Sequence, residues 1–149
     1  MVETNSEINK SNTSNSTDNS MGKIVLDTFD IFGENIILSE RCFDFHTDTD
    51  NKDQEDVNTR IKLLQNGHIE DTLIDPHYIY KDFSKPDVRH RYLKVIFDRD
   101  ISNHFLGCLV VVDYKRTPKE IATWFPINKL TNQEVLPDTE AMIYDSNKK

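Results

Sequence analysis

The sequence predicts an α+β fold in which amino-terminal short strands and helices precede a four-stranded antiparallel sheet. The first indication is the run of residues 105–112, which is apolar at both alternating sets of positions, as in a strand that is buried on both faces. The β-branched triplet Val110-Val111-Val112 favours a strand over a helix at its centre. The second indication is that strand-like segments flank this run with connections short enough to make neighbouring strands antiparallel. The third is that apolar residues farther upstream recur at helical spacing.

The composition predicts one folded domain between two polar ends. Hydrophobic residues make up 36% of the 149 residues, below the roughly 45–50% of typical globular domains. The deficit is concentrated in residues 1–21, which are mostly Asn, Ser and Thr and cannot bury enough apolar surface to offset the entropy lost on ordering. We therefore expect a disordered tail over residues 1–21, one α+β domain over residues 22–136 and a loosely held polar tail over residues 137–149.

The amino-terminal elements of the domain are short. Residues 23–27 and 35–38 are apolar runs separated by Phe32-Gly33-Glu34-Asn35, which indicates a small hairpin or an edge strand followed by a turn. Ser39 can cap a short helix over residues 40–46. That helix would place Cys42, Phe43 and His46 near one side.

Two further helices precede the sheet. Val57, Ile61 and Leu64 recur at helical spacing within residues 53–66, and Asn66-Gly67 is a typical helix stop. A second helix over residues 68–74 ends before Asp75-Pro76. The four predicted strands of the sheet are then residues 77–82, 88–97, 104–114 and 120–125.

The charge of the chain is uneven. The formal net charge is −8, and residues 1–60 carry five Lys and Arg against thirteen Asp and Glu, whereas the remainder carries thirteen of each. The amino-terminal part is therefore a poor phosphate binder, but the core can still carry a local basic face. No run approaches the ~20 apolar residues of a membrane span, so we expect no membrane association. Two cysteines in apolar surroundings, Cys42 and Cys108, fit a reduced cytoplasmic protein.

Cationic and aromatic residues crowd residues 89–94, Arg-His-Arg-Tyr-Leu-Lys. Because side chains alternate along a strand, His90, Tyr92 and Lys94 share one face while Arg89 and Arg91 share the other. The first set can meet a phosphate and stack a base. The alternative is a set of cations that only keeps a strand soluble.

The final strand offers a hydroxyl and an indole. Thr123 can project from the sheet beside the cationic strand, although a strand threonine is most often structural. Trp124 is either a core anchor or a platform for a base. The histidines show no HExxH motif and no paired Cys/His spacing, so we expect neither a metal site nor a cofactor.

Five segments together resemble the phage-associated nucleases of the barnase–EndoU–colicin–RelE-like (BECR) class. They are Ile-Leu-Ser-Glu-Arg at 37–41 followed by His46, residues 69–79, Arg-Tyr-Leu-Lys at 91–94, Leu-Val-Val-Val at 109–112, and Glu-Ile-Ala-Thr-Trp at 120–124. The resemblance covers about residues 36–128. It implies a small α+β domain whose amino-terminal helical part precedes a four-stranded antiparallel sheet.

The resemblance also implies metal-independent RNA cleavage by attack of the ribose 2′-hydroxyl on the adjacent phosphorus. A general base, a general acid and cations would serve that reaction. His46 would then be base or acid, Arg91 and Lys94 would hold phosphate, and Thr123 would bond a non-bridging oxygen. Substrate binding is expected of five further residues, namely Arg41, Arg89, His90, Tyr92 and Trp124. Arg91 and Lys94 lie on opposite faces of an ideal strand, so a bulge or twist would be needed for both to serve.

Three functions remain open at this stage. The first is an RNA-cleaving, toxin-like or phage-derived enzyme whose partners are RNA and a cognate immunity or antitoxin protein. The second is a catalytically inactive module of the same fold that binds RNA or protein, because the related nucleases carry a histidine pair where this chain has His46 alone. The third is an acidic immunity or antitoxin-like inhibitor of a nuclease, which the net charge and the acidic residues 44–56 favour. A cationic cleft containing His46, Lys94 and Thr123 would support the enzyme, and an unbroken acidic face would support the inhibitor.

Overall fold

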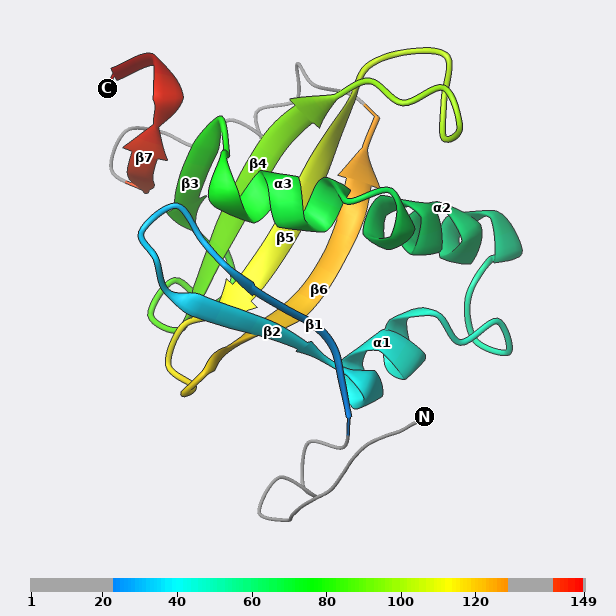
Figure 1. Ribbon diagram of the computed structural model, residues 1–149, viewed down its shortest axis with the longest axis horizontal. Helices are drawn as coiled ribbons and strands as arrows, with labels where there is room; N and C mark the ends of the chain where they lie inside the picture. The colour runs from blue at the N-terminus through cyan, green and yellow to red at the C-terminus, as the bar shows by residue number, and fades with distance from the viewer. Residues whose placement is uncertain (1–22, 129–140, 149) are drawn as a thin grey trace, which may run out of the picture.

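The computed structural model describes residues 23–128 and 141–148 and has the α+β architecture that the sequence predicts (Figure 1). The elements, in chain order, are β1 (Ile24–Phe29), β2 (Asn35–Ser39), α1 (Glu40–His46), α2 (Gln54–Gln65), α3 (His68–Ile74), β3 (Tyr78–Lys81), β4 (Arg89–Ile96), β5 (Leu106–Asp113), β6 (Lys119–Ile127), β7 (Met142–Asp145) and a 3-10 turn (Ser146–Lys148). The expectation of disorder for residues 1–21 lies outside the described residues.

Within the described residues the sheet has seven strands rather than the four expected, in the order β1-β2-β6-β5-β4-β3-β7. The four predicted strands are its antiparallel centre, β3 to β6. The hairpin of β1 and β2 adds to this centre because β2 pairs in parallel with β6, where Ile36 lies opposite Lys119 and Ile37 opposite Glu120. Apolar alternation marks such segments as strands but does not show which edge they join.

The other added strand corrects the expectation for the carboxyl-terminal tail. Residues 142–145 form β7, which pairs antiparallel with β3, and Tyr78 lies opposite Asp145 in that pairing. A four-residue strand with mixed polarity gives too short an alternation to stand out in the sequence. This part of the tail therefore belongs to the sheet.

The helices begin and end where the sequence signals predict. Ser39 caps α1, since its side chain accepts a hydrogen bond from the Cys42 backbone N–H at 3.1 Å. Asp53 caps α2 in the same manner through the Asp56 N–H. Between α2 and α3, Gly67 adopts a φ of 81°, a left-handed conformation that glycine adopts without a Cβ clash.

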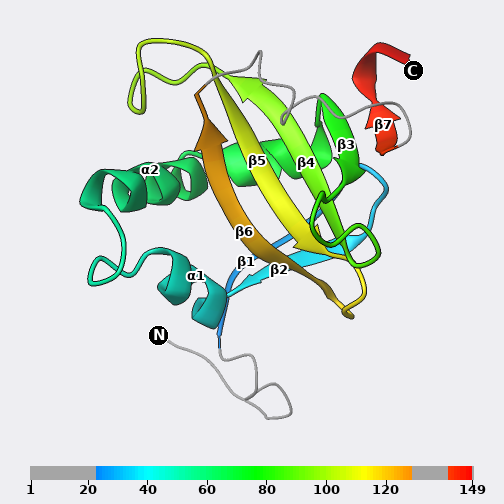
Figure 2. The same ribbon diagram turned by 180° about the vertical axis from the view of Figure 1, so that it is seen from behind.

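The helices leave one face of the central sheet without helical cover. In Figure 1, α3 crosses the near face of β4 and β5, where Ile69 and Leu73 pack against Tyr92, Val110 and other buried residues. Figure 2 shows the opposite side, on which β4, β5 and β6 carry no helix. We call that side the helix-free face. No helix in the described part of the chain is long and apolar enough to cross a membrane.

A candidate active site on the helix-free face

A cleft of about 570 Å³ opens where α1 meets the adjoining ends of β4, β5 and β6. It is lined by Ser39, Arg41, Cys42, Phe45, His46, Arg89, Asp113, Arg116, Glu120, Ile121, Ala122 and Thr123. Four of the predicted site residues meet in this cleft: His46, Thr123, Arg41 and Arg89. A short helix and three strands, separated by up to about 80 residues of sequence, therefore build one site.

A β-bulge in β6 joins the sheet to α1. Val111 pairs with Thr123 but Val112 pairs with Ile121, so Ala122 is the extra residue. The bulge takes the Ala122 carbonyl out of the regular ladder, and it accepts a hydrogen bond from His46 Nε2 at 2.8 Å. From the sequence, a bulge or twist was expected in β4, where it would let Arg91 and Lys94 act together. That strand pairs regularly with β5 from Arg89 to Ile96, and the bulge lies two strands away.

This contact fixes the tautomer of His46. A carbonyl only accepts, so Nε2 carries the proton and Nδ1 of the neutral ring is left as the basic nitrogen. Burial lowers the pKa of His46 below its usual value, and the nearby positive charges of Arg60 and Lys52 lower it further against the opposing effect of the Ala122 carbonyl. The imidazole is thus held neutral with Nδ1 as a proton acceptor, which is the state that a general base needs.

Thr123 lies between His46 and a buried arginine. Its Oγ1 accepts a hydrogen bond from Nη1 of Arg60 at 3.2 Å and lies 3.5 Å from Nδ1 of His46. Arg60 comes from α2 and also donates to the Trp124 carbonyl, while the Trp124 indole N–H donates back to the Arg60 carbonyl at 2.9 Å. The hydroxyl of Thr123 is therefore oriented by Arg60 and directed toward the basic nitrogen of His46.

Guanidinium groups supply the positive charge of the cleft. Arg41, Arg89 and Arg116 line it together with two carboxylates, Asp113 and Glu120. Arg116 is paired with both carboxylates, at 3.5 Å in each case.

Arg89 differs from Arg116 in its pairing. Within the described part of the chain, the buried Nε of Arg89 has no hydrogen-bond partner. Such a donor is costly to bury. Arg60 Nε and three buried hydroxyls share this property within the described residues, so the contribution of Arg89 to the site rests on its place in the lining of the cleft.

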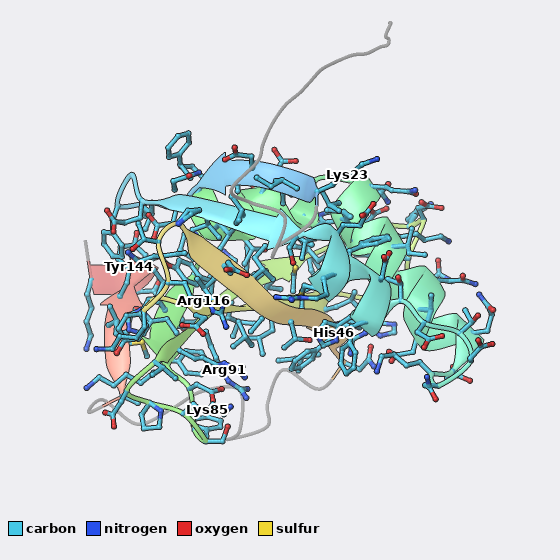
Figure 3. The ribbon with its side chains drawn as sticks, turned by 90° about the horizontal axis from the view of Figure 1, so that it is seen from below. Lys23, His46, Lys85, Arg91, Arg116 and Tyr144 are labelled. Carbon is cyan, nitrogen blue, oxygen red and sulfur yellow. The ribbon has the colours of Figure 1, made fainter. Side chains whose placement is uncertain are left out.

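The two cations predicted to hold phosphate lie outside the cleft. Arg91 is on the helix-free face, as Figure 3 shows for its side chain, but its Nε donates to the buried Asp82 at 2.5 Å. Arg91, Val111 and Thr123 are aligned across β4, β5 and β6, which separates Arg91 from Thr123 by roughly 10 Å. Thr123 is therefore not beside the cationic strand, because β5 lies between them.

Lys94 points to the opposite side of the sheet. Because β4 has no bulge, alternation places its side chain on the face that α3 covers. There its ammonium group pairs with Asp71 at 2.9 Å and with Asp75 at 3.0 Å. Burial acts to lower the pKa of Lys94, but the hydrogen bonds and charges of these two carboxylates together outweigh it, so the pKa is raised.

Three predicted substrate contacts are part of the packing on the α3 side. Tyr92 is buried and donates a hydrogen bond to Asp30 at 2.5 Å, and Trp124 is fully buried. His90 stacks on Tyr114 with ring centroids 3.9 Å apart, and burial lowers its pKa. A base cannot stack on Tyr92 or Trp124 in this arrangement, since neither ring is exposed.

The sequence does not single out several residues of the site, among them Arg60, Arg116, Glu120 and Phe45. Arg60 is one of several polar residues on an amphipathic helix, and nothing in the spacing of α2 distinguishes it. Arg116 lies in the turn between β5 and β6, and Glu120 begins the predicted strand 120–125, so neither position by itself marks a cleft residue. No group of three or more His, Cys, Asp or Glu within residues 23–128 and 141–148 is arranged to hold a metal ion.

Comparison with known protein families gives a match over most of the chain. A family described as phage-Barnase-EndoU-ColicinE5/D-RelE like nuclease 2 matches residues 15–145. No curated protein and no solved structure matches the chain.

Proposed function

Because the chain belongs to the phage Barnase–EndoU–ColicinE5/D–RelE-like nuclease 2 family, we propose that it is an endoribonuclease that uses the ribose 2′-hydroxyl as its nucleophile. The observation that carries the proposal is the shared cleft. It brings a neutral imidazole with a basic Nδ1, the Thr123 hydroxyl beside that nitrogen and the Arg89 guanidinium together on the helix-free face. These are the groups that transfer of a phosphoryl group between oxygens requires when no cofactor takes part.

His46 acts as the general base in this proposal. Its Nδ1 takes the proton of the 2′-hydroxyl as that oxygen attacks the adjacent phosphorus, while Nε2 stays hydrogen-bonded to the Ala122 carbonyl. The bond from phosphorus to the 5′-oxygen of the next nucleotide breaks, and that oxygen takes up a proton from water. The hydroxide left behind takes the proton that His46 gained, which restores the neutral imidazole. The products are a 2′,3′-cyclic phosphate and a free 5′-hydroxyl.

Positive charge on the phosphate comes from Arg89 and Arg41 rather than from Arg91 and Lys94. Charge on the non-bridging oxygens grows as the phosphorus becomes five-coordinate, and preorganised guanidinium donors stabilise it. Both Arg89 and Arg41 line the cleft. Thr123 would give its hydroxyl to a non-bridging oxygen or to the attacking 2′-oxygen, with Arg60 holding it in place.

The inhibitor hypothesis fits the cleft less well. An acidic inhibitor of a basic nuclease would present an unbroken acidic face. Three arginines and two carboxylates line the cleft instead, and the histidine lies among them. A cleft of this kind is suited to receive a phosphate rather than to mimic one.

The test is cleavage of single-stranded RNA by the purified full chain in EDTA, comparing wild type with His46→Ala and Arg89→Gln. We expect His46→Ala to lower the rate by about 10²–10⁴-fold, because general-base catalysis contributes that much. His104→Ala is the matched control, since His104 is exposed and lies outside the cleft. Circular dichroism of each variant checks that the fold is kept. An RNA that stays intact with wild type, or His46→Ala and His104→Ala enzymes of equal rate, would contradict the proposal.

A further inference from the structure

We infer that Phe45 is the platform on which the base of the attacking nucleotide stacks, which makes unpaired, single-stranded RNA the substrate. The inference rests on the proposed function and adds to it the site for a base. Tyr92 and Trp124 are aromatic residues that the sequence suggests for base stacking, and both rings are buried. An aromatic ring that is both exposed and beside the catalytic groups must therefore come from another element.

Phe45 meets both conditions. It is 66% exposed, and its side chain lines the cleft in the last turn of α1, immediately before His46. Its ring stands edge-on to the imidazole, with centroids 5.0 Å apart and planes at 88°. A base stacked on Phe45 therefore has its own ribose next to the basic nitrogen of His46, where the 2′-hydroxyl has to lie.

The charge around Phe45 suits a nucleotide rather than an apolar partner. The ammonium group of Lys52 lies over one face of the Phe45 ring, 5.0 Å from its centroid, which leaves the other face for a base. The guanidinium groups of Arg41 and Arg89 line the same cleft. An aromatic ring beside positive charges is the usual means of holding single-stranded nucleic acid, since the cations meet phosphates and the ring meets a base. The other exposed aromatic rings, such as Phe105, do not line this cleft.

Two properties of the substrate follow. Every base has a π-face, so stacking tolerates all four bases at this position. The base must leave any helical stack to reach Phe45, so a nucleotide in a duplex is cut more slowly than the same nucleotide in a single strand.

The test uses a DNA oligonucleotide with one internal ribonucleotide, because only that nucleotide offers a 2′-hydroxyl. A second version carries at the same place a ribose that keeps its 2′-hydroxyl but has no base. Wild type, Phe45→Leu and Phe45→Tyr are compared on both, with Phe105→Leu as the matched control because Phe105 is 62% exposed. Loss of the base should slow wild type and Phe105→Leu by roughly 10-fold to 100-fold, the range for one base stacked on one aromatic ring.

The rates of wild type and Phe45→Leu on the two oligonucleotides form a double-mutant cycle, which separates stacking from a structural role of Phe45. We expect Phe45→Leu to cut the complete oligonucleotide about as slowly as wild type cuts the baseless one, and to lose little more when the base is removed. Phe45→Tyr should restore the rate. If removal of the base slows wild type and Phe45→Leu by the same factor, or slows neither, the inference is overturned while the proposed cleavage reaction stands.

A binding measurement keeps the inference testable apart from the reaction. Fluorescence anisotropy with an all-deoxy oligonucleotide, which cannot be cut by 2′-hydroxyl attack, compares a complete strand with one that lacks a single base. A wild-type preference for the complete strand that disappears in Phe45→Leu supports the platform. Equal preferences in both proteins overturn it, and neither result depends on cleavage.

Discussion

Replacement of Arg60 by methionine tests how the site is held together. The change keeps an apolar stem of similar length and removes the guanidinium group, whose side chain is only 13% exposed. Two hydrogen bonds from Nη1 are lost, one to Thr123 Oγ1 and one to the Trp124 carbonyl. Hydrogen bonds from a charged donor contribute about 1.5–3 kcal/mol each. The ion pair with Asp56 adds little, because that carboxylate is largely solvated.

We therefore expect Arg60→Met to lower the free energy of unfolding by roughly 3–6 kcal/mol, a large share of the 5–15 kcal/mol of a typical domain. Urea unfolding followed by circular dichroism measures the change from the midpoint and the slope. Arg99→Met is the control, since Arg99 is exposed and a surface change of this kind should stay within about 0.5 kcal/mol.

The same variant has a predicted signature in the pH dependence of cleavage. Burial lowers the pKa of His46, and the charge of Arg60 lowers it further, so the base stays neutral to a more acidic pH than an ordinary histidine would. Without Arg60 the pKa of His46 rises, and the acid limb of the rate profile moves to higher pH. An unchanged unfolding midpoint together with an unchanged acid limb would refute the assignment of Arg60 as the residue that positions Thr123 and His46.

Three further predictions concern residues outside the proposed chemistry. Tyr92→Phe should destabilise the fold by about 1.5–3 kcal/mol in urea unfolding, because it removes the hydroxyl that donates to Oδ2 of the buried Asp30 carboxylate. It should not change RNA affinity in an anisotropy titration. Lys94→Met should leave the cleavage rate unchanged, since its ammonium group is bound to carboxylates on the α3 side, and a rate loss like that of a cleft variant would contradict its placement. Cys42 should resist iodoacetamide at pH 7.5 in the folded protein and react in urea, because burial raises the pKa of its thiol to about 11 and only the thiolate attacks. Rapid labelling of the folded protein would contradict this burial.

Local signals in the sequence were sufficient for the helices and the central strands. Ser39 and Asp53 are cap residues whose side chains accept the expected backbone hydrogen bonds, and Gly67 ends α2 in the conformation that glycine favours. These signals act over a few residues, so periodicity and capping rules recover them. The pairing of β2 with β6 depends on which edge is free after the other strands have met, and no local pattern carries that information.

The sequence likewise predicted part of the site and missed the part that depends on how the elements pack. Alternation along β4 correctly separates Lys94 from Arg91, but it does not show which face α3 covers. His46 and Thr123 lie together, as the resemblance to the phage-associated nucleases implied. Arg60 could not be predicted, because its role depends on the packing of α2 against β6, and that packing follows from the whole fold.

The central claim is that the ribose 2′-hydroxyl attacks the phosphorus in the cleft formed by α1 and β6. The most direct measurement is mass spectrometry of the products after wild-type protein has cut a short RNA in EDTA. Attack by the 2′-oxygen predicts fragments that end in a 2′,3′-cyclic phosphate, partnered by fragments with a 5′-hydroxyl. Fragments with a 5′-phosphate and a free 3′-hydroxyl would show that water is the nucleophile and would contradict the account.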